Sequence, residues 1–176
     1  IGMSEADTGS DLASVRTRAV RTDAGWRVNG AKLWTTNAHH CQYMILLCRT
    51  GPLDPERRHA GLSQFLVDLT LPGIAIRPIA NLAGEHHFNE VVFVDALLPP
   101  DAILGGEGEG WAQVTGELAY ERSGPERFLS SFTLLVELIR VLSPAADERA
   151  QIGVGRLGAQ LVTLRRMSRS VAGLLQ

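Results

Sequence analysis

The first part of the chain alternates hydrophobic and polar residues with the two-residue period of β-strands. Residues 13–20 (ASVRTRAV) alternate small or apolar residues with charged ones, which predicts a half-exposed strand. Residues 42–49 form a continuous apolar run, which is typical of a buried central strand. Further short strands are predicted at residues 63–69, 73–79 and 89–96. Because turn-rich segments separate these runs, the pattern indicates an antiparallel β-sandwich or barrel.

Asn29-Gly30 is the strongest hairpin signal in this region, because both central positions of a tight hairpin turn need positive φ. We therefore expect one strand to end before Asn29 and the next to carry Trp34. Strand alternation puts Trp34 and Thr36 on one face, where an aromatic plane beside a hydroxyl could hold a flat heteroaromatic ring. A core tryptophan next to an edge pair of threonines, Thr35 and Thr36, is the alternative.

The period changes to that of a helix after residues 97–110, a segment that holds two prolines and four glycines. Apolar residues then recur at steps of three and four over residues 111–139, which predicts one long helix. Ser143 and Pro144 are typical of the N-cap and first turn of another helix. The apolar stripe of that helix continues to Leu175.

Together these patterns predict an α+β chain. Residues 1–104 should form an antiparallel β-sandwich or barrel domain, and residues 105–176 the first helices of an antiparallel helical bundle. Since two helices cannot close a bundle, we expect that more chain follows or that another subunit covers them.

Glu121 interrupts the apolar stripe of the first predicted helix, between Leu118 and Pro125. A carboxylate there would lose hydration, and desolvated carboxylates serve as general bases. The alternative is that Glu121 pairs with Arg122 or Arg127, or that the stripe is open to solvent at this turn. Pro125 would leave the Glu121 carbonyl without its helical donor and should bend the helix.

Composition narrows the class of protein. The chain is 45% hydrophobic and 20% charged, with a net charge of −2, so neither nucleic acid nor anionic lipid is an expected partner. No apolar run is long enough to cross a membrane. Cys41 and Cys48 have no metal-site or redox spacing, so we expect reduced core cysteines in a cytoplasmic protein. The first residue is not a start methionine, so we expect an internal piece of a longer protein.

The five histidines include two adjacent pairs, His39-His40 and His86-His87. Neighbouring residues on a strand point to opposite faces, so neither pair should form a chelate. We therefore predict no metal site.

Residues 4–11 (SEADTGSD) form a polar segment rich in small residues. The hydroxyls of Ser4, Thr8 and Ser10, with the backbone amides of such a loop, could bind carbonyl or phosphate groups. An ordinary capped turn is the alternative.

Three blocks resemble the acyl-CoA dehydrogenase family: MSEADTGSDLASVRTRAV, WRVNGAKLWTTNA and FNEVVFVDALLPPDAILGGEGEGW. They match the family's motifs in order across residues 1–122. Ser4 stands where the family usually has Thr, and Ala6 where it has Pro. The chain after residue 122 lacks the family's Arg-x-x-Phe-Gly motif. The resemblance implies a flavoprotein whose N-terminal helices and bundle end are missing from this chain.

The resemblance also implies site residues. Thr36 matches a threonine whose hydroxyl faces flavin N5, and Trp34 matches a tryptophan packed against the isoalloxazine. The expected FAD-binding residues are Ile1, Met3, Ser4, Trp34, Thr35 and Thr36.

For the substrate, Ser10 matches a serine that contacts the pantetheine of coenzyme A. Glu121 matches the catalytic base of one branch of the family, and the neighbouring Arg122 is expected at the substrate. Many members keep the base further along the chain, which would leave Glu121 structural.

The implied function is FAD-dependent α,β-dehydrogenation of an acyl-CoA thioester in fatty acid metabolism. Electrons would pass to an electron-transferring flavoprotein, from a bacterial-type, cytoplasmic homo- or hetero-oligomer (dimer or tetramer). We expect the isolated chain to be inactive. The alternatives are a flavin oxidase of the same superfamily and a non-catalytic subunit of a hetero-oligomeric dehydrogenase.

Overall fold

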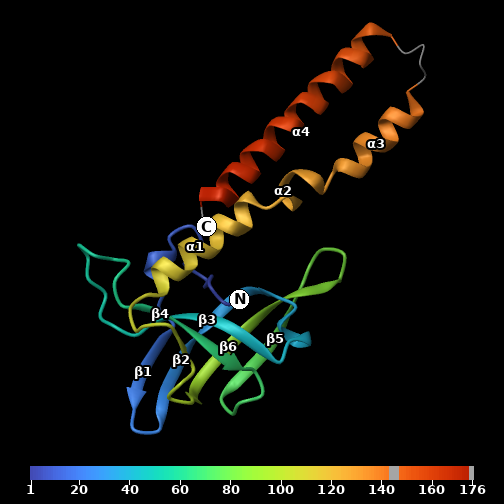
Figure 1. The fold of residues 1–176 in the computed structure, drawn as a ribbon. Helices are drawn as coiled ribbons and strands as arrows, with labels where there is room; N and C mark the ends of the chain where they lie inside the picture. The colour runs from blue at the N-terminus through green and yellow to red at the C-terminus, as the bar shows by residue number, and fades with distance from the viewer. Residues whose placement is uncertain (143–146, 175–176) are drawn as a thin grey trace. The chain divides into compact units, whose positions relative to one another are not determined.

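The computed structural model describes residues 1–142 and 147–174. The chain divides into two compact units, Ile1–Val114 and Thr115–Gln176, and each is described by itself. The first unit contains the strands and the second contains most of the helical residues (Figure 1).

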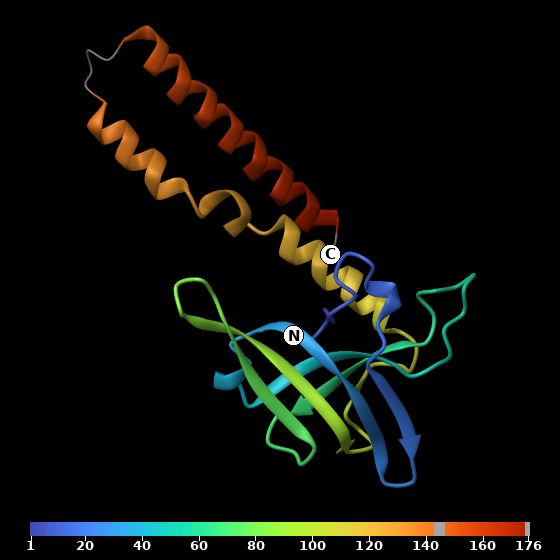
Figure 2. The same cartoon turned by 180° about the vertical axis from the view of Figure 1, so that it is seen from behind.

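The first unit is built on one seven-stranded sheet with the strand order β5-β6-β2-β1-β3-β4-β7. The strands are β1 Arg18–Thr22, β2 Gly25–Thr36, β3 Tyr43–Arg49, β4 Leu62–Asp68, β5 Ile74–Ala80, β6 His86–Leu98 and β7 Ile103–Leu104. Neighbouring strands are antiparallel except β1 and β3, which pair in parallel. Figure 2 shows the sheet from behind. The predicted β-domain followed by helices is confirmed, with a mixed sheet in place of a purely antiparallel one.

The core lies on the inward face of this sheet. Trp26 on β2 meets Phe65 on β4 edge to face, with ring centroids 5.1 Å apart. Its indole Nε1 donates a hydrogen bond of 3.3 Å to the Pro100 carbonyl, so the polar atom of this buried ring is satisfied. The predicted central strand at residues 42–49 is confirmed as β3, because most of its side chains are buried.

The predicted hairpin at Asn29-Gly30 is wrong, because β2 runs straight through both residues. The chain reverses earlier, where Thr22 on β1 pairs with Gly25 on β2. Asn29 instead clasps a bulge in β6. Its side-chain oxygen accepts a hydrogen bond of 2.9 Å from the Asp95 amide, and its Nδ2 donates one of 3.0 Å to the Asp95 carboxylate. The Asn29-Gly30 pair therefore lies opposite a bulge in β6 and not in a turn. Gly30 still has the positive φ that a hairpin turn would need.

The strand predicted at residues 13–20 forms only in part. A 3-10 helix, η1 Leu12–Ser14, occupies its beginning, and β1 starts at Arg18. Asp11 explains the difference, because its carboxylate accepts a hydrogen bond from the Ser14 hydroxyl and favours a local turn over an extended chain.

The two cysteines differ, so the prediction that both lie in the core is half wrong. Cys48 is buried on β3, whereas Cys41 is exposed. Burial raises the pKa of the Cys48 thiol to about 12, which keeps this thiol protonated and unreactive.

The helices are α1 Gly110–Ser123, α2 Glu126–Leu129, α3 Phe132–Val141 and α4 Glu148–Leu174. The single long helix predicted over residues 111–139 is wrong, since the chain is interrupted twice. The first break follows Ser123 and confirms the effect expected of Pro125, which lacks the amide that would continue the helix. Within the described residues, no helix is both long and apolar enough to cross a membrane.

Helices α3 and α4 lie side by side and antiparallel in both views (Figures 1 and 2). The second predicted helix is confirmed as α4; its predicted start at Ser143-Pro144 and its stripe position Leu175 lie outside the described residues. Large apolar side chains on these helices remain exposed, among them Leu134, Val141, Val162 and Met167.

Candidate functional site

The end of β2 carries a bulge that re-aims Trp34. The pairing with β6 passes from Lys32 opposite Val91 to Thr35 opposite Asn89, so β2 gains one residue. Trp34 takes a φ of 60° there, a strained conformation for a bulky residue. Its side chain is 57% exposed. Bulges of this kind often turn a side chain toward a binding site.

Thr36 and Trp34 are both exposed, whereas Thr35 between them is buried. The indole is flanked by Phe88, whose ring meets it at 81° with centroids 6.0 Å apart. A flat aromatic face and a hydroxyl therefore point out of the same strand end. The Thr35 hydroxyl points inward and has no hydrogen-bond partner among the described residues.

The N-terminal segment lies directly against this strand end. The Leu33 amide donates to the Ser4 carbonyl at 2.9 Å, and the Lys32 ammonium donates to the Met3 carbonyl at 2.9 Å. The backbone of Met3 and Ser4 is therefore bound to Lys32 and Leu33, the two residues that precede Trp34.

Gly2 anchors the same segment on the other side, where its amide donates to Ile45 and its carbonyl accepts from Leu47, both on β3. A Cβ at Gly2 would lie 2.3 Å from the terminal methyl of Met44 and 3.2 Å from Lys32 Cγ, so a larger residue here would require these side chains to move. Ile1, ahead of it, is 48% exposed.

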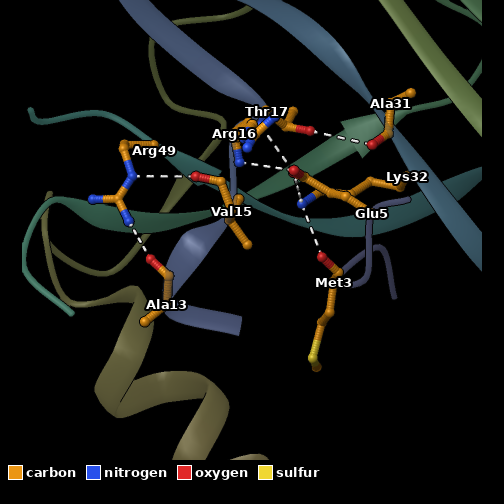
Figure 3. Close-up of polar contacts among 9 residues, drawn as sticks. All are labelled: Met3, Glu5, Ala13, Val15, Arg16, Thr17, Ala31, Lys32 and Arg49. Carbon is orange, nitrogen blue, oxygen red and sulfur yellow. Dashed lines mark hydrogen bonds and ion pairs between the residues drawn. The ribbon is translucent and has the colours of Figure 1, made fainter. Parts of the chain in front are cut away.

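A buried ion pair fixes this arrangement (Figure 3). Lys32 Nζ lies 2.8 Å from Glu5 Oε1, and the two side chains are 0% and 10% exposed. The Glu5 carboxylate also accepts hydrogen bonds from the amides of Arg16 and Thr17, at 2.7 and 2.8 Å. Every polar group of the pair therefore has a partner, as a buried pair requires.

The pKa values of this pair shift in the directions that burial and pairing produce. Burial raises the pKa of Glu5, but the Lys32 charge and the hydrogen bonds to the carboxylate outweigh it and leave the pKa lowered. Burial lowers the pKa of Lys32, and attraction to Glu5 opposes that shift. The lowered pKa of Glu5 favours its charged form beside Lys32.

Ser10 lies in the loop that follows. Glu5 and Thr8 exchange backbone hydrogen bonds of 2.8 and 3.2 Å, which closes a turn and leaves Ser10 exposed. Asp11 next to it accepts from the Ser14 hydroxyl and pairs with Arg58 at 2.7 Å. These hydrogen bonds lower the pKa of the Asp11 carboxyl. The capped-turn interpretation of this segment is therefore correct, and it does not prevent Ser10 from meeting a ligand.

Arg49 on β3 holds the chain that follows this loop. Its guanidinium donates to the carbonyls of Ala13 at 2.7 Å and Val15 at 3.2 Å (Figure 3). It also donates to Ala60 and Arg58. One buried side chain therefore ties η1 to the segment between β3 and β4.

Glu121 and Arg122 belong to the second unit, near the end of α1. The Glu121 carboxylate forms an ion pair with Arg127, and its side chain is 51% exposed. Arg127 Nε also donates to the Glu121 carbonyl at 3.3 Å, which supplies a donor that Pro125 cannot. The expected loss of hydration at Glu121 is therefore wrong, because its side chain is half exposed, and both alternatives are observed: Glu121 pairs with Arg127 and this turn is open to solvent.

The structure thus brings Met3, Ser4, Trp34 and Thr36 together at one strand end of the first unit. Sequence reasoning missed Lys32 and its partner. Alternation along one strand from Trp26 would have placed Lys32 on the buried face. The turn predicted at Asn29-Gly30 divided this strand in two, so the alternation was not followed as far as Lys32.

The histidines are arranged differently from the prediction. His39 and His40 lie on a 3-10 helix, η2 Ala38–His40, and not on a strand. The His39 ring stacks on His86 from the other pair, with centroids 4.0 Å apart. Among the described residues, no group of three or more potential ligands is placed to hold a metal ion.

Comparison with known proteins identifies relatives of this chain among the acyl-CoA dehydrogenases. Residues 1–96 match the model of the acyl-CoA dehydrogenase middle domain. Acyl-CoA dehydrogenase FadE34 of Mycobacterium tuberculosis is 40% identical over 155 residues, which cover 88% of this chain and 22% of that protein. Acyl-CoA dehydrogenase IpdE1 of the same organism is 42% identical over 151 residues, which cover 83% of this chain and 39% of that protein.

Solved structures agree. The ChsE4-ChsE5 complex from Mycobacterium tuberculosis matches with a TM-score of 0.77 and 29% identity, covering 98% of this chain and 46% of that one. An acyl-CoA dehydrogenase from Geobacillus kaustophilus matches in fold with a TM-score of 0.80 and 24% identity, covering 99% and 49%. This chain spans less than half the length of each of these proteins. The match of the family model to more than half of the chain confirms the resemblance seen in the motifs, and the chain belongs to the acyl-CoA dehydrogenase family.

Proposed function

We propose that this chain is part of an FAD-dependent enzyme that removes hydrogen from the α- and β-carbons of an acyl-CoA thioester. Membership of the family supports oxidoreductase chemistry on acyl-CoA. The observation that carries the proposal is the strained bulge that turns the Trp34 indole outward beside the exposed Thr36. Strain of this kind persists where the surrounding structure imposes it, commonly at functional sites.

The residues at this strand end fit a flavin. Trp34 offers a flat face for the isoalloxazine, and Thr36 offers a hydroxyl beside it. Met3 and Ser4, held by Lys32 and the strand, together with Ile1 would lie along the pyrimidine edge, and Thr35, whose side chain is buried, would take part through its backbone. The chemistry that a bound FAD supplies is acceptance of the hydride from the β-carbon.

Ser10, exposed on its closed turn, would contact the pantetheine, and Arg122 would lie at the acyl-CoA. Glu121 would take the proton from the α-carbon. Since the Glu121 carboxylate pairs with Arg127, this pair has to open before the base can reach its proton. Exclusion of water and polarisation of the thioester carbonyl would make that carbon acidic enough.

The test uses the full-length protein that contains this chain. Purified with FAD, it should be yellow, and anaerobic addition of acyl-CoA should bleach the flavin. Glu121→Gln should keep FAD and slow bleaching by about 10²- to 10⁴-fold, the usual worth of a general base. Glu117→Gln, one turn earlier on α1, is the matched control and should bleach at the wild-type rate. A colourless protein that FAD does not reconstitute would refute the proposal.

A non-catalytic subunit of a hetero-oligomeric dehydrogenase is the second candidate. The pairing of Glu121 with Arg127 favours it, because this carboxylate is engaged already. Similarity to one chain of a two-protein complex favours it too. In that case Glu121→Gln would leave turnover of the native complex unchanged. A flavin oxidase of the same superfamily would instead consume oxygen rapidly with bound substrate.

The remaining parts of the proposal concern assembly. The exposed apolar side chains of α3 and α4 would be covered by further helices of the full-length chain or by another subunit in a dimer or tetramer. Electrons would leave to an electron-transferring flavoprotein in the cytoplasm of a bacterial-type cell. The chain 1–176 alone should not turn over, because it spans only part of its relatives.

A further inference from the structure

A buried amide lies directly behind the proposed flavin wall. Asn89 on β6 is 0% exposed. Its side chain makes three hydrogen bonds: to the Thr35 carbonyl at 3.0 Å, to His39 Nδ1 at 3.2 Å and to His86 Nε2 at 2.7 Å. Asn89 therefore connects the strand end to a pair of stacked imidazoles.

Only one arrangement of protons satisfies all three bonds. The Asn89 amide nitrogen uses one hydrogen for the Thr35 carbonyl and the other for His39 Nδ1, while its oxygen accepts from His86 Nε2–H. His39 Nδ1 must then carry a lone pair, so the His39 ring has to be neutral. A proton on Nδ1 would face the amide hydrogens and break this bond.

The bond to Thr35 matters because of the bulge. Pairing between β2 and β6 slips between Lys32 and Thr35, which interrupts the regular ladder next to Trp34. The Asn89 side chain supplies an additional hydrogen bond to the backbone directly after this slip.

We propose that Asn89 is a positioning residue for the Trp34–Thr36 strand end, and that neutral His39 keeps its amide in the orientation that holds Thr35. This proposal rests on the proposed function, since the strand end it positions is the proposed flavin wall. Acidification should release the Thr35 carbonyl by protonating His39 and loosen that wall.

The groups around His39 influence the pH at which its ring becomes protonated. The His40 and His86 ring centroids lie 3.8 and 4.0 Å away, and His87, which pairs with Glu85 at 3.5 Å, also acts on His39. Desolvation is the largest effect and lowers the pKa of His39. The positive charges that His40, His86 and His87 can carry also lower it, and together these effects outweigh the hydrogen bond to Asn89, which raises it.

The Arg77–Glu90 pair and Cys41 are further charged or titratable groups near η2. The strand β5, which packs against η2, carries Arg77, and its guanidinium is paired with Glu90 of β6 at 3.2 Å. Cys41 caps the end of η2 and is exposed. Neither the Arg77 pair nor Cys41 is among the groups that act on the pKa of His39.

Hydrogen exchange on the full-length protein without FAD tests the proposal independently of catalysis. Protection factors of the amides in residues 33–37 should fall between pH ~7 and ~5, because the lowered pKa of His39 places its protonation below the ordinary histidine value of about 6.5. Asn89→Leu should lower them by about tenfold already at the higher pH, as the loss of one or two hydrogen bonds implies. Unchanged protection in Asn89→Leu would overturn the positioning role.

Histidine variants provide the matched comparison. In His39→Asn, the introduced side-chain oxygen takes the place of Nδ1 and accepts from Asn89 at every pH, so the acid-induced loss of protection should disappear. His40→Asn should keep it, because His40 touches His39 but is not a hydrogen-bond partner of Asn89 in the described chain. Acid sensitivity that survives His39→Asn, or that His40→Asn removes equally, would overturn the role of His39.

A flavin titration separates this inference from the proposed function. If the full-length protein binds FAD, Asn89→Leu should weaken binding several-fold, and the pH dependence of binding should follow that of the exchange data. If the protein binds no FAD, the proposed function fails, and the exchange data alone still decide whether Asn89 and His39 hold the strand end.

Discussion

Replacing Lys32 with methionine is the sharpest perturbation of the strand end. Methionine keeps the length and apolar stem of lysine but removes the ammonium that binds Met3 and Glu5. The Glu5 carboxylate would then remain buried without a countercharge. The N-terminal segment would lose the contact that holds it beside Trp34.

The structure sets the size of the effect. The side chain of Glu5 is 10% exposed and that of Lys32 is 0% exposed, so breaking their pair should cost about 3–5 kcal/mol. The orphaned Met3 carbonyl contributes part of that cost. The two backbone amides that remain on Glu5, from Arg16 and Thr17, keep the loss from being larger.

Urea unfolding of the 1–176 chain, followed by tryptophan fluorescence, measures this loss. All three tryptophans lie within Ile1–Val114, so the signal reports on the unit that contains the pair. With a typical slope of about 2 kcal/mol per molar urea, the midpoint should fall by about 1.5–2.5 M. Arg16→Met is the control: its exposed pair with Asp7 should barely move the midpoint.

A midpoint shift below about 0.5 M in Lys32→Met would refute the reasoning. The double variant Glu5→Leu with Lys32→Met should recover much of the stability, because an apolar pair leaves no buried charge. The pKa of Glu5 is lowered from 4.5, so its stabilising contribution is present above that pH and is lost as the pH falls through the lowered folded value. This acid-induced loss should be absent from the double variant.

Two further variants test local features of the same unit. Gly30→Ala would place a Cβ 2.6 Å from the Thr17 hydroxyl oxygen at a φ of +141°, and we expect it to lower the free energy of unfolding in urea by about 1–3 kcal/mol. Gly9→Ala, where a Cβ would meet open space, is the control and should be close to neutral. Equal effects of the two variants would contradict the steric argument. Thiol labelling of the native chain at pH 8 should modify exposed Cys41 and spare Cys48, whose pKa is about 12, until urea is added; labelling of both thiols without urea would show that Cys48 is accessible.

Local signals in the sequence were reliable where one physical cause acts over a short span. Short apolar runs separated by turn-rich segments predicted most of the strands, because strands with buried faces are rich in apolar residues and turns interrupt them. Pro125 predicted the break after α1 because the missing amide is a property of that residue alone. The motif blocks predicted the family, which the family model then confirmed.

Predictions from local sequence failed where the outcome depends on a contact between two segments that are distant in the chain. Asn29-Gly30 suits a turn and a bulge equally, and only the clasp on Asp95 shows which one forms. His39 and His86 are far apart in the chain, and Asn89 brings them together only once β2 and β6 are paired in their bulged register.

By itself, the sequence determined that a β-domain comes first and helices follow, and it determined the family, because these depend on neighbouring residues and on motifs. Only the tertiary structure decided that Lys32 is a buried partner of Glu5, that Trp34 turns outward at a bulge and that Glu121 pairs with Arg127. Each of these depends on a register or a contact between separate segments, and the free energy of such contacts exists only after the segments have packed.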